Sequence, residues 1–212
     1  MAFTTESGLH LPNRWALIEI NALEDIVGAN GFKSLLHLAG LHQLVGFYPP
    51  DDMEPQYDFA FFAAMNAGLE DLYGFHAARM LAIRAGRATY PSITTNFGNW
   101  VGMEDSDFEG MDPVDGLRIS LGMISDAFSL LSDQISTVDE LDDRFVYRIE
   151  RCSACWERES DHACCYIWSG LLLEATRRAT QGMEIRVEEV ACHAKGDEAC
   201  SFEIFKPEGP AV

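Results

Sequence analysis

Basic residues are scarce in this sequence, where 15 lysines and arginines face 34 aspartates and glutamates and give a formal net charge of −19. A surface of that sign repels phosphate backbones and anionic lipid headgroups. We therefore expect no nucleic-acid partner. The chain also has no apolar run near the ~18 to 20 residues that a membrane span needs. Its start, MAFTTESGLH, lacks the charged and apolar regions of a secretory signal. The expectation is a cytoplasmic protein without a membrane span.

Long linkers and familiar catalytic loops are missing as well. There is no low-complexity segment, no repeat at solenoid period and no Gly/Ser stretch that would divide domains. No phosphate-binding glycine loop, nucleophile elbow or dinucleotide fingerprint is present. Apolar residues make up 48% of the chain and aromatic residues 11%, enough for one sizeable core. We predict a single domain over 1–212, with a mainly helical part at 1–142 and a metal-binding part at 143–206.

Cysteine is absent from the first 151 residues, and all six cysteines lie between Cys152 and Cys200. A disulfide scaffold would scatter its bridges over the fold, and a reducing compartment does not favour one. Thiols crowded together with acids and histidines are typical of metal ligation. The alternative is that these cysteines act as small apolar core residues.

Apolar residues at helical spacing fill most of the N-terminal part. The stretch from Leu17 to Val27 is followed by Gly28 and Asn30-Gly31, which predict a stop. The segment 91–115 is rich in glycine, asparagine and acid, so we predict a long irregular connection that forms a lid or pocket wall. Further helices are predicted at about 32–45, 59–85 and 115–135.

The pattern changes near residue 143. Segments 145–151, 185–190 and 200–205 alternate apolar and polar residues like half-buried strands. A helix is predicted at 163–181, and Lys195-Gly196-Asp197 predicts a hairpin turn. The fold class is α+β: an N-terminal helical layer packed on a C-terminal antiparallel sheet with a crossing helix.

The predicted hairpin would bring Cys192 and Cys200 together at its strand ends. Glu189 shares parity with the apolar positions of its strand and should point inward, whereas Glu188 should face water. Cys165 begins the helix that packs on this sheet and could supply a further ligand. Three thiolates and one carboxylate suit zinc better than magnesium or calcium.

The motif Cys165-x4-Gly170, Gly182, Glu189-x2-Cys192 and Gly196-Asp197-x2-Cys200-x-Phe202-x-Ile204 resembles the 4-vinyl-reductase (4VR) domain family. The opening Leu11-Pro-Asn-Arg14, Gly28-x2-Gly31 and Leu38-Ala39-Gly40-Leu41 resembles the free-standing bacterial members. The family shares its fold with core subunits of the TRAPP tethering complex. It also occurs as the sensor domain of phenol- and xylene-responsive activators and includes a protein once assigned to bacteriochlorophyll 4-vinyl reduction.

The resemblance implies a structural zinc held by Cys165, Glu189, Cys192 and Cys200. The helix between the first two of these ligands is one residue longer than the sensor pattern, so Cys164 is an alternate. Cys152-x2-Cys155 offers a second thiol pair, and an iron–sulfur cluster is a further possibility. His162 and His193 flank the thiols as candidate ligands or acid–base groups, and the simpler interpretation is that they are solvated. The helical histidines are interpreted as partly buried side chains: His37, His42 and His76.

The resemblance also implies an apolar pocket between the helical layer and the sheet, although the same rings could simply fill the core. The expected function is a non-enzymatic module that binds an aromatic compound or a tetrapyrrole precursor and acts through a partner protein. A homodimer through the N-terminal helices is expected. The alternatives are a tetrapyrrole vinyl reductase, for which no nicotinamide or flavin motif is seen, and an assembly factor without a pocket. The candidate pocket residues are Phe97, Trp100, Phe108, Tyr147 and Trp168.

Overall fold

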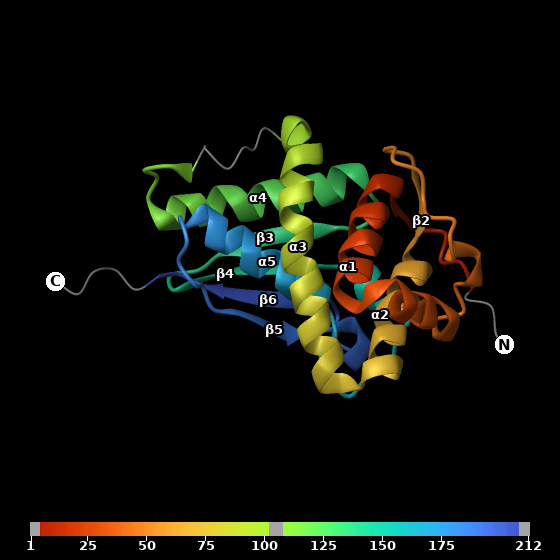
Figure 1. Cartoon of the computed structure of the whole chain (residues 1–212). Helices are drawn as coiled ribbons and strands as arrows, with labels where there is room; N and C mark the ends of the chain where they lie inside the picture. The colour runs from red at the N-terminus through yellow and green to blue at the C-terminus, as the bar shows by residue number, and fades with distance from the viewer. Residues whose placement is uncertain (1–4, 102–107, 208–212) are drawn as a thin grey trace.

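A computed structural model describes residues 5–101 and 108–207, and it combines a helical layer with a four-stranded antiparallel sheet (Figure 1). The predicted α+β fold class is confirmed. Short 3₁₀ turns lie at His42–Leu44, Ser153–Cys155 and His193–Lys195. The helices are α1 (Asn13–Leu38), α2 (Phe59–Tyr73), α3 (Phe75–Val101), α4 (Pro113–Leu131) and α5 (Tyr166–Ala179), and the strands are β1 (His10–Pro12), β2 (Pro55–Asp58), β3 (Ser136–Glu140), β4 (Arg144–Ile149), β5 (Val187–Ala191) and β6 (Cys200–Phe205).

Two glycines with positive φ interrupt the first three helices. Gly28 has a φ of 75° and kinks α1, where the sequence predicted a stop between two helices. Gly74, with a φ of 74°, separates α2 from α3. The single helix predicted for 59–85 is therefore wrong, because a residue in this conformation cannot continue a right-handed helix.

The irregular connection predicted for 91–115 is also wrong over its first part, because α3 continues through Pro91 to Val101. Proline removes one helical hydrogen bond, which made the sequence favour a break. The hydroxyl groups of Thr94 and Thr95 donate to the Pro91 carbonyl oxygen at 3.0 and 2.9 Å. Tyr90 and Ile93 on either side of the proline are buried, so tertiary packing outweighs its local preference.

The sheet has the order β3-β4-β6-β5, with neighbouring strands antiparallel. In the β4 and β6 pair, Tyr147 lies opposite Phe202 and Phe145 opposite Ile204, and these side chains are buried on one face. That face is covered by α4 and α5 (Figure 1). Strand β3 was not predicted, and it is fastened to α4 by the Ser125 hydroxyl, which donates to the Ser136 carbonyl oxygen at 2.8 Å.

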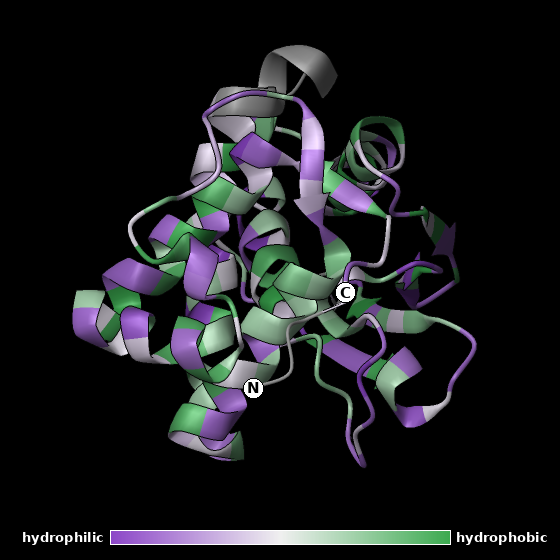
Figure 2. Ribbon diagram, turned by 90° about the vertical axis from the view of Figure 1, so that its right-hand side faces the viewer, coloured by the Kyte–Doolittle hydropathy of each residue, from purple (hydrophilic) through white to green (hydrophobic). Residues whose placement is uncertain are grey.

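Helix α5 is the predicted crossing helix, and α3 packs across its outer side (Figure 1). Glycines make the crossing close: a Cβ on Gly86 would lie 2.0 Å from the Ile167 carbonyl oxygen, and one on Gly170 would lie 2.1 Å from that of Ile83. In Figure 2 the helices carry both hydrophilic and hydrophobic segments, as expected for helices with one buried side. Within the described ranges, none of them has the length and apolar character needed to cross a membrane.

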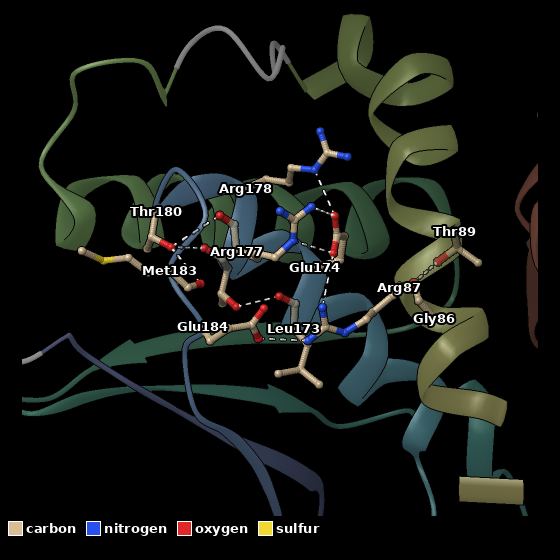
Figure 3. Close-up of polar contacts among 11 residues, drawn as sticks. Gly86, Arg87, Thr89, Leu173, Glu174, Arg177, Arg178, Thr180, Met183 and Glu184 are labelled. Carbon is tan, nitrogen blue, oxygen red and sulfur yellow. Dashed lines mark hydrogen bonds and ion pairs between the residues drawn. The ribbon is translucent and has the colours of Figure 1, made fainter. Parts of the chain in front are cut away.

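Ion pairs also join α3 to α5 (Figure 3). The Glu174 side chain is 9% exposed, lies 3.6 Å from Arg87 of α3 and accepts hydrogen bonds at 3.0 Å from Nε of Arg177 and of Arg178. Burial raises the pKa of Glu174, but the arginines lower it further, so the net shift is downward. Arg87 also lies 3.3 Å from Glu184, which follows α5. This network fixes the C-terminal half of α5.

Candidate metal centre and ligand cavity

Six buried cysteines meet where α5, β5, β6 and the 3₁₀ turn Ser153–Cys155 come together. Cys165 is the residue before the first turn of α5, Cys192 follows β5 and Cys200 begins β6. Cys152 precedes the short 3₁₀ turn and Cys155 ends it. Positive φ at Gly196, 91°, closes the hairpin that returns the chain from Cys192 to Cys200, as its turn residues predicted.

The sulfur atoms lie at distances that suit a tetrahedral metal. Cys165 Sγ lies 3.5 Å from that of Cys152, 3.7 Å from that of Cys192 and 3.6 Å from that of Cys200. Cys155 and Cys200 are 3.4 Å apart, and Cys192 and Cys200 4.0 Å apart. Zinc–sulfur bonds of about 2.3 Å give a tetrahedron with edges of roughly 3.8 Å. The spacing of the thiols therefore fits zinc.

Glu189 faces this cluster, whereas Glu188 is exposed. The Oε2 atom of Glu189 accepts a hydrogen bond of 2.9 Å from the backbone N–H of Cys165. Its Oε1 is buried and has no hydrogen-bond partner within the described residues. Burial, and then the charge of the nearby thiols, raises the pKa of Glu189 to about 9. A buried oxygen without a partner beside several thiols is what a metal ligand looks like before the cation is in place.

The ligand atoms of Cys165, Glu189, Cys192 and Cys200 all lie within 4.8 Å of one another, as do those of a second set, Cys152, Cys155, Cys165 and Cys200. Both the family-implied set and the Cys152/Cys155 alternates are thus brought together. Cys164 lies 3.9 Å from Cys192 by its sulfur and belongs to neither set.

The flanking histidines have other partners. His193 Nε2 lies 2.7 Å from the carbonyl oxygen of Glu150, and its backbone N–H donates to Cys200 Sγ at 3.4 Å. His162 Nδ1 lies 2.5 Å from Asp161. The helical histidines also have partners outside the cluster: the rings of His37 and His42 contact each other, with 2.7 Å between their Nδ1 atoms, and His76 packs against Phe75.

Arg158 is a cation beside the cluster that the sequence analysis missed. Its side chain is 12% exposed and lies 3.0 Å from Glu70. Burial lowers the pKa of Arg158, but the charges of Cys164 and Glu70 raise it further, so the net shift is upward. A retained buried guanidinium offsets part of the negative charge of a thiolate site. Its position three residues after Cys155 was the available signal.

An apolar cavity enclosing about 510 Å³ lies among the helices. It is narrow and its wall is apolar, with residues from α1, α3, α4 and α5 and from the turn before α1. Its principal lining residues are Trp15, Tyr90, Ile93, Ile124, Phe128 and Leu171.

A second cavity of about 230 Å³ adjoins the first and shares Trp15 and Leu171 with it. Two unsatisfied polar groups line it: Glu19, which is 1% exposed, and Trp168. Neither Glu19 Oε1 nor Trp168 Nε1 has a hydrogen-bond partner among residues 5–101 and 108–207. Burial raises the pKa of Glu19 well above its usual value, and a contact with Asn66 offsets this in part. The Glu19 carboxyl is therefore held in its protonated form near neutral pH.

The predicted pocket residues divide between wall and core. Trp168 lines the second cavity, and Tyr147 stacks on it with ring centroids 6.3 Å apart. Phe108 is buried away from both cavities. Phe97 and Trp100 lie in the last turns of α3, and their side chains fall outside the described part. Within that part, the sheet strands β3 to β6 line neither cavity, because large side chains of β4 and β6 fill the space beneath α4 and α5.

Comparison with known families bears on the part of the chain that carries the cysteines. Residues 145–206 match the model of the vinyl-4-reductase (V-4-R) domain. The resemblance to the 4-vinyl-reductase family is confirmed. The matched segment runs from β4 through α5 to the residue after β6, so it contains all six cysteines and Trp168. No curated protein matches the sequence.

Solved structures extend the likeness to nearly the whole chain. An H-NOX protein from K. algicida, in an unliganded Fe(II) state, superposes with a TM-score of 0.58 at 13% identity, covering 95% of this chain and 100% of that one. An H-NOX protein from S. oneidensis in the Fe(II)NO state gives 0.54 at 16% identity, covering 88% and 96%. The phenol-responsive sensory domain of PoxR gives only 0.42 at 17% identity, covering 68% and 73%. At these identities the H-NOX likeness shows a shared fold and nothing further.

Proposed function

We propose that this chain is a non-enzymatic module that binds a small hydrophobic molecule between its helices and passes the binding event to a partner protein. The observation that carries the proposal is the pair of joined cavities, apolar over their larger part and ending at the buried Glu19 carboxyl and Trp168 indole. Buried polar groups without partners are costly, so a site that keeps them is suited to a ligand that satisfies them.

The arrangement favours an aromatic or apolar molecule with one hydroxyl group. A protonated Glu19 can donate to or accept from such a hydroxyl, and Trp168 Nε1 can donate to its oxygen. The apolar remainder of the ligand would lie among Trp15, Phe128 and Leu171. A tetrapyrrole precursor is the second candidate ligand class, and it would require the narrow cavity to widen.

The metal in this proposal is zinc, and its role is structural. Four protein ligands leave no open position for substrate, and thiolates select a soft divalent cation. Cys165 lies at the start of α5, three residues before Trp168 and six before Leu171, so the metal site would fix the end of the helix that lines both cavities. We propose that ligand entry shifts α5 against this fixed end and that a homodimer face on the N-terminal helices relays the shift.

Isothermal titration with p-cresol and with toluene tests the proposal. We expect p-cresol to bind about 5- to 10-fold more tightly, since one net hydrogen bond contributes roughly 1 kcal/mol. Trp168→Phe, which removes the Nε1 donor, should bring the two affinities together. Leu171→Phe should weaken both ligands by narrowing both cavities. Leu130→Phe is the matched control, because Leu130 is 72% exposed.

The alternatives give different results. If neither probe binds and the purified protein retains no organic molecule, the binding proposal is wrong. Turnover of a divinyl tetrapyrrole with added reductant would support a vinyl reductase instead. A stable hetero-complex with the cavity empty would support an assembly factor.

A further inference from the structure

The two sets of metal-ligating residues share two members. Cys165 and Cys200 belong to both, while Cys152 and Cys155 complete one set and Glu189 and Cys192 complete the other. Within each set all ligand atoms lie within 4.8 Å of one another, but the six residues do not form one such group. The ligands therefore surround two neighbouring centres rather than one.

The distances describe two tetrahedra with a common edge. The shared edge runs from Cys165 Sγ to Cys200 Sγ and measures 3.6 Å. On one side, Cys152 lies 3.5 Å from Cys165, and Cys155 lies 3.4 Å from Cys200. On the other, Cys192 lies 3.7 Å from Cys165 and 4.0 Å from Cys200. Each value is near the roughly 3.8 Å edge expected for zinc–sulfur bonds.

We propose that this chain binds two divalent zinc ions in a thiolate cluster. Cys165 and Cys200 bridge the two ions. Cys152 and Cys155 complete the first zinc site, and Cys192 with Glu189 completes the second. A single ion at the second site would leave two further buried thiols at ligand distance from its own ligands, with no role.

The charge balance supports two ions. Five thiolates and one carboxylate carry six negative charges, and two divalent cations carry four positive ones, which leaves a charge of about −2. The buried guanidinium of Arg158 adds a positive charge at the edge of the cluster, where its nearest carboxylate is Glu70 at 3.0 Å. One divalent ion among the same six ionised ligands would leave about −4, which a buried site does not sustain.

The two zinc sites differ in access. A surface depression of about 410 Å³ is lined by Cys152, Cys155, Trp156 and His193 together with two glutamates. The first site therefore adjoins solvent, while the second lies between β5 and the start of α5. We expect a chelator to remove the first zinc before the second.

This inference is independent of the ligand cavity, and metal counting tests it. Native mass spectrometry and elemental analysis of protein purified under reducing, chelator-free conditions should give two zinc ions per chain. The double variant Cys152→Ser/Cys155→Ser should retain one. Cys164→Ser is the matched control, and it should retain two, because Cys164 lies outside both sets.

Cobalt(II) substitution of the wild-type protein provides a measurement that does not depend on a variant folding. The visible bands of tetrahedral cobalt thiolate should grow up to two equivalents. Magnetic coupling should appear as the second site fills, since the bridging thiolates connect the two ions. An end point at one equivalent, a single zinc in the wild-type protein, or iron with labile sulfide would each overturn the two-zinc cluster.

Discussion

At the residue scale, Glu19 is the side chain whose environment departs most from its usual preference. It lies on α1 among Ala16, Ile20 and Leu23, all of which are buried. The helical spacing of these neighbours was visible in the sequence and placed Glu19 on the inward side. The acidic residue was nevertheless passed over, because a lone carboxylate inside a core is rare. Its neighbours in space, Trp168 and Asn66, come from distant helices that the sequence could not place beside it.

The buried carboxyl predicts a pH dependence of stability. The folded-state pKa of Glu19 is raised above its unfolded value, so its contribution is fully present below the unfolded pKa and is lost as pH rises toward the folded pKa. Glu19→Gln should therefore lessen the fall in unfolding free energy between about pH 5 and about pH 8. Urea denaturation at both pH values measures it. Asp25→Asn, an exposed change on the same helix, is the control. Equal pH dependence in wild type and Glu19→Gln would contradict the assignment.

The cysteines differ in what their loss should cost. Cys200→Ser removes a residue common to both ligand sets, and structural metal sites contribute their binding free energy to folding. We expect a loss above about 5 kcal/mol, which leaves little folded protein. Cys164→Ser should cost no more than about 2 kcal/mol, the cost of a buried hydroxyl. Thermal melts with and without a chelator measure both, and a normal melt for Cys200→Ser would rule out a structural metal there.

At the element scale, the crossing of α3 over α5 depends on glycine. Gly86→Ala and Gly170→Ala would each drive a Cβ close to a backbone oxygen, at 2.0 and 2.1 Å. We expect each to cost more than about 3 kcal/mol by overpacking and helix displacement. Gly122→Ala in α4 is the matched control, since its Cβ would meet no atom within 4 Å. That change should stabilise the protein by roughly 0.5 to 1 kcal/mol. Similar melting temperatures for all three variants would contradict this packing.

Elements with strong periodicity were predictable, and those that depend on distant contacts were not. Strand β6 was predicted at its observed limits, Cys200–Phe205, because apolar and polar residues alternate along it. Strand β3 carries the sequence STVDE, which has little apolar alternation and is held by β4 and by serines of α4. Helix α3 continued through Pro91 because its neighbours are buried. In both cases tertiary contacts outweighed the local pattern.

At the scale of the whole molecule, the two candidate sites are joined by one helix. Helix α5 begins at the cysteine cluster, lines both cavities with Trp168 and Leu171, and ends in the ion pairs of Glu174 (Figure 3). The cysteine spacing made the cluster predictable from sequence, because its ligands lie within one segment. The cavities were not predictable, since their walls come from helices spread over the chain.

Native mass spectrometry of freshly purified protein, followed by denaturing mass spectrometry of the same sample, tests the central claim most directly. The binding module predicts a metal-bound chain with an additional small organic mass that is released on denaturation, or that appears when p-cresol is added. Leu171→Phe should lose this mass while keeping its metal, whereas Leu130→Phe should keep both. A metal-bound wild-type chain that retains no organic mass and takes up no p-cresol would contradict the proposed function.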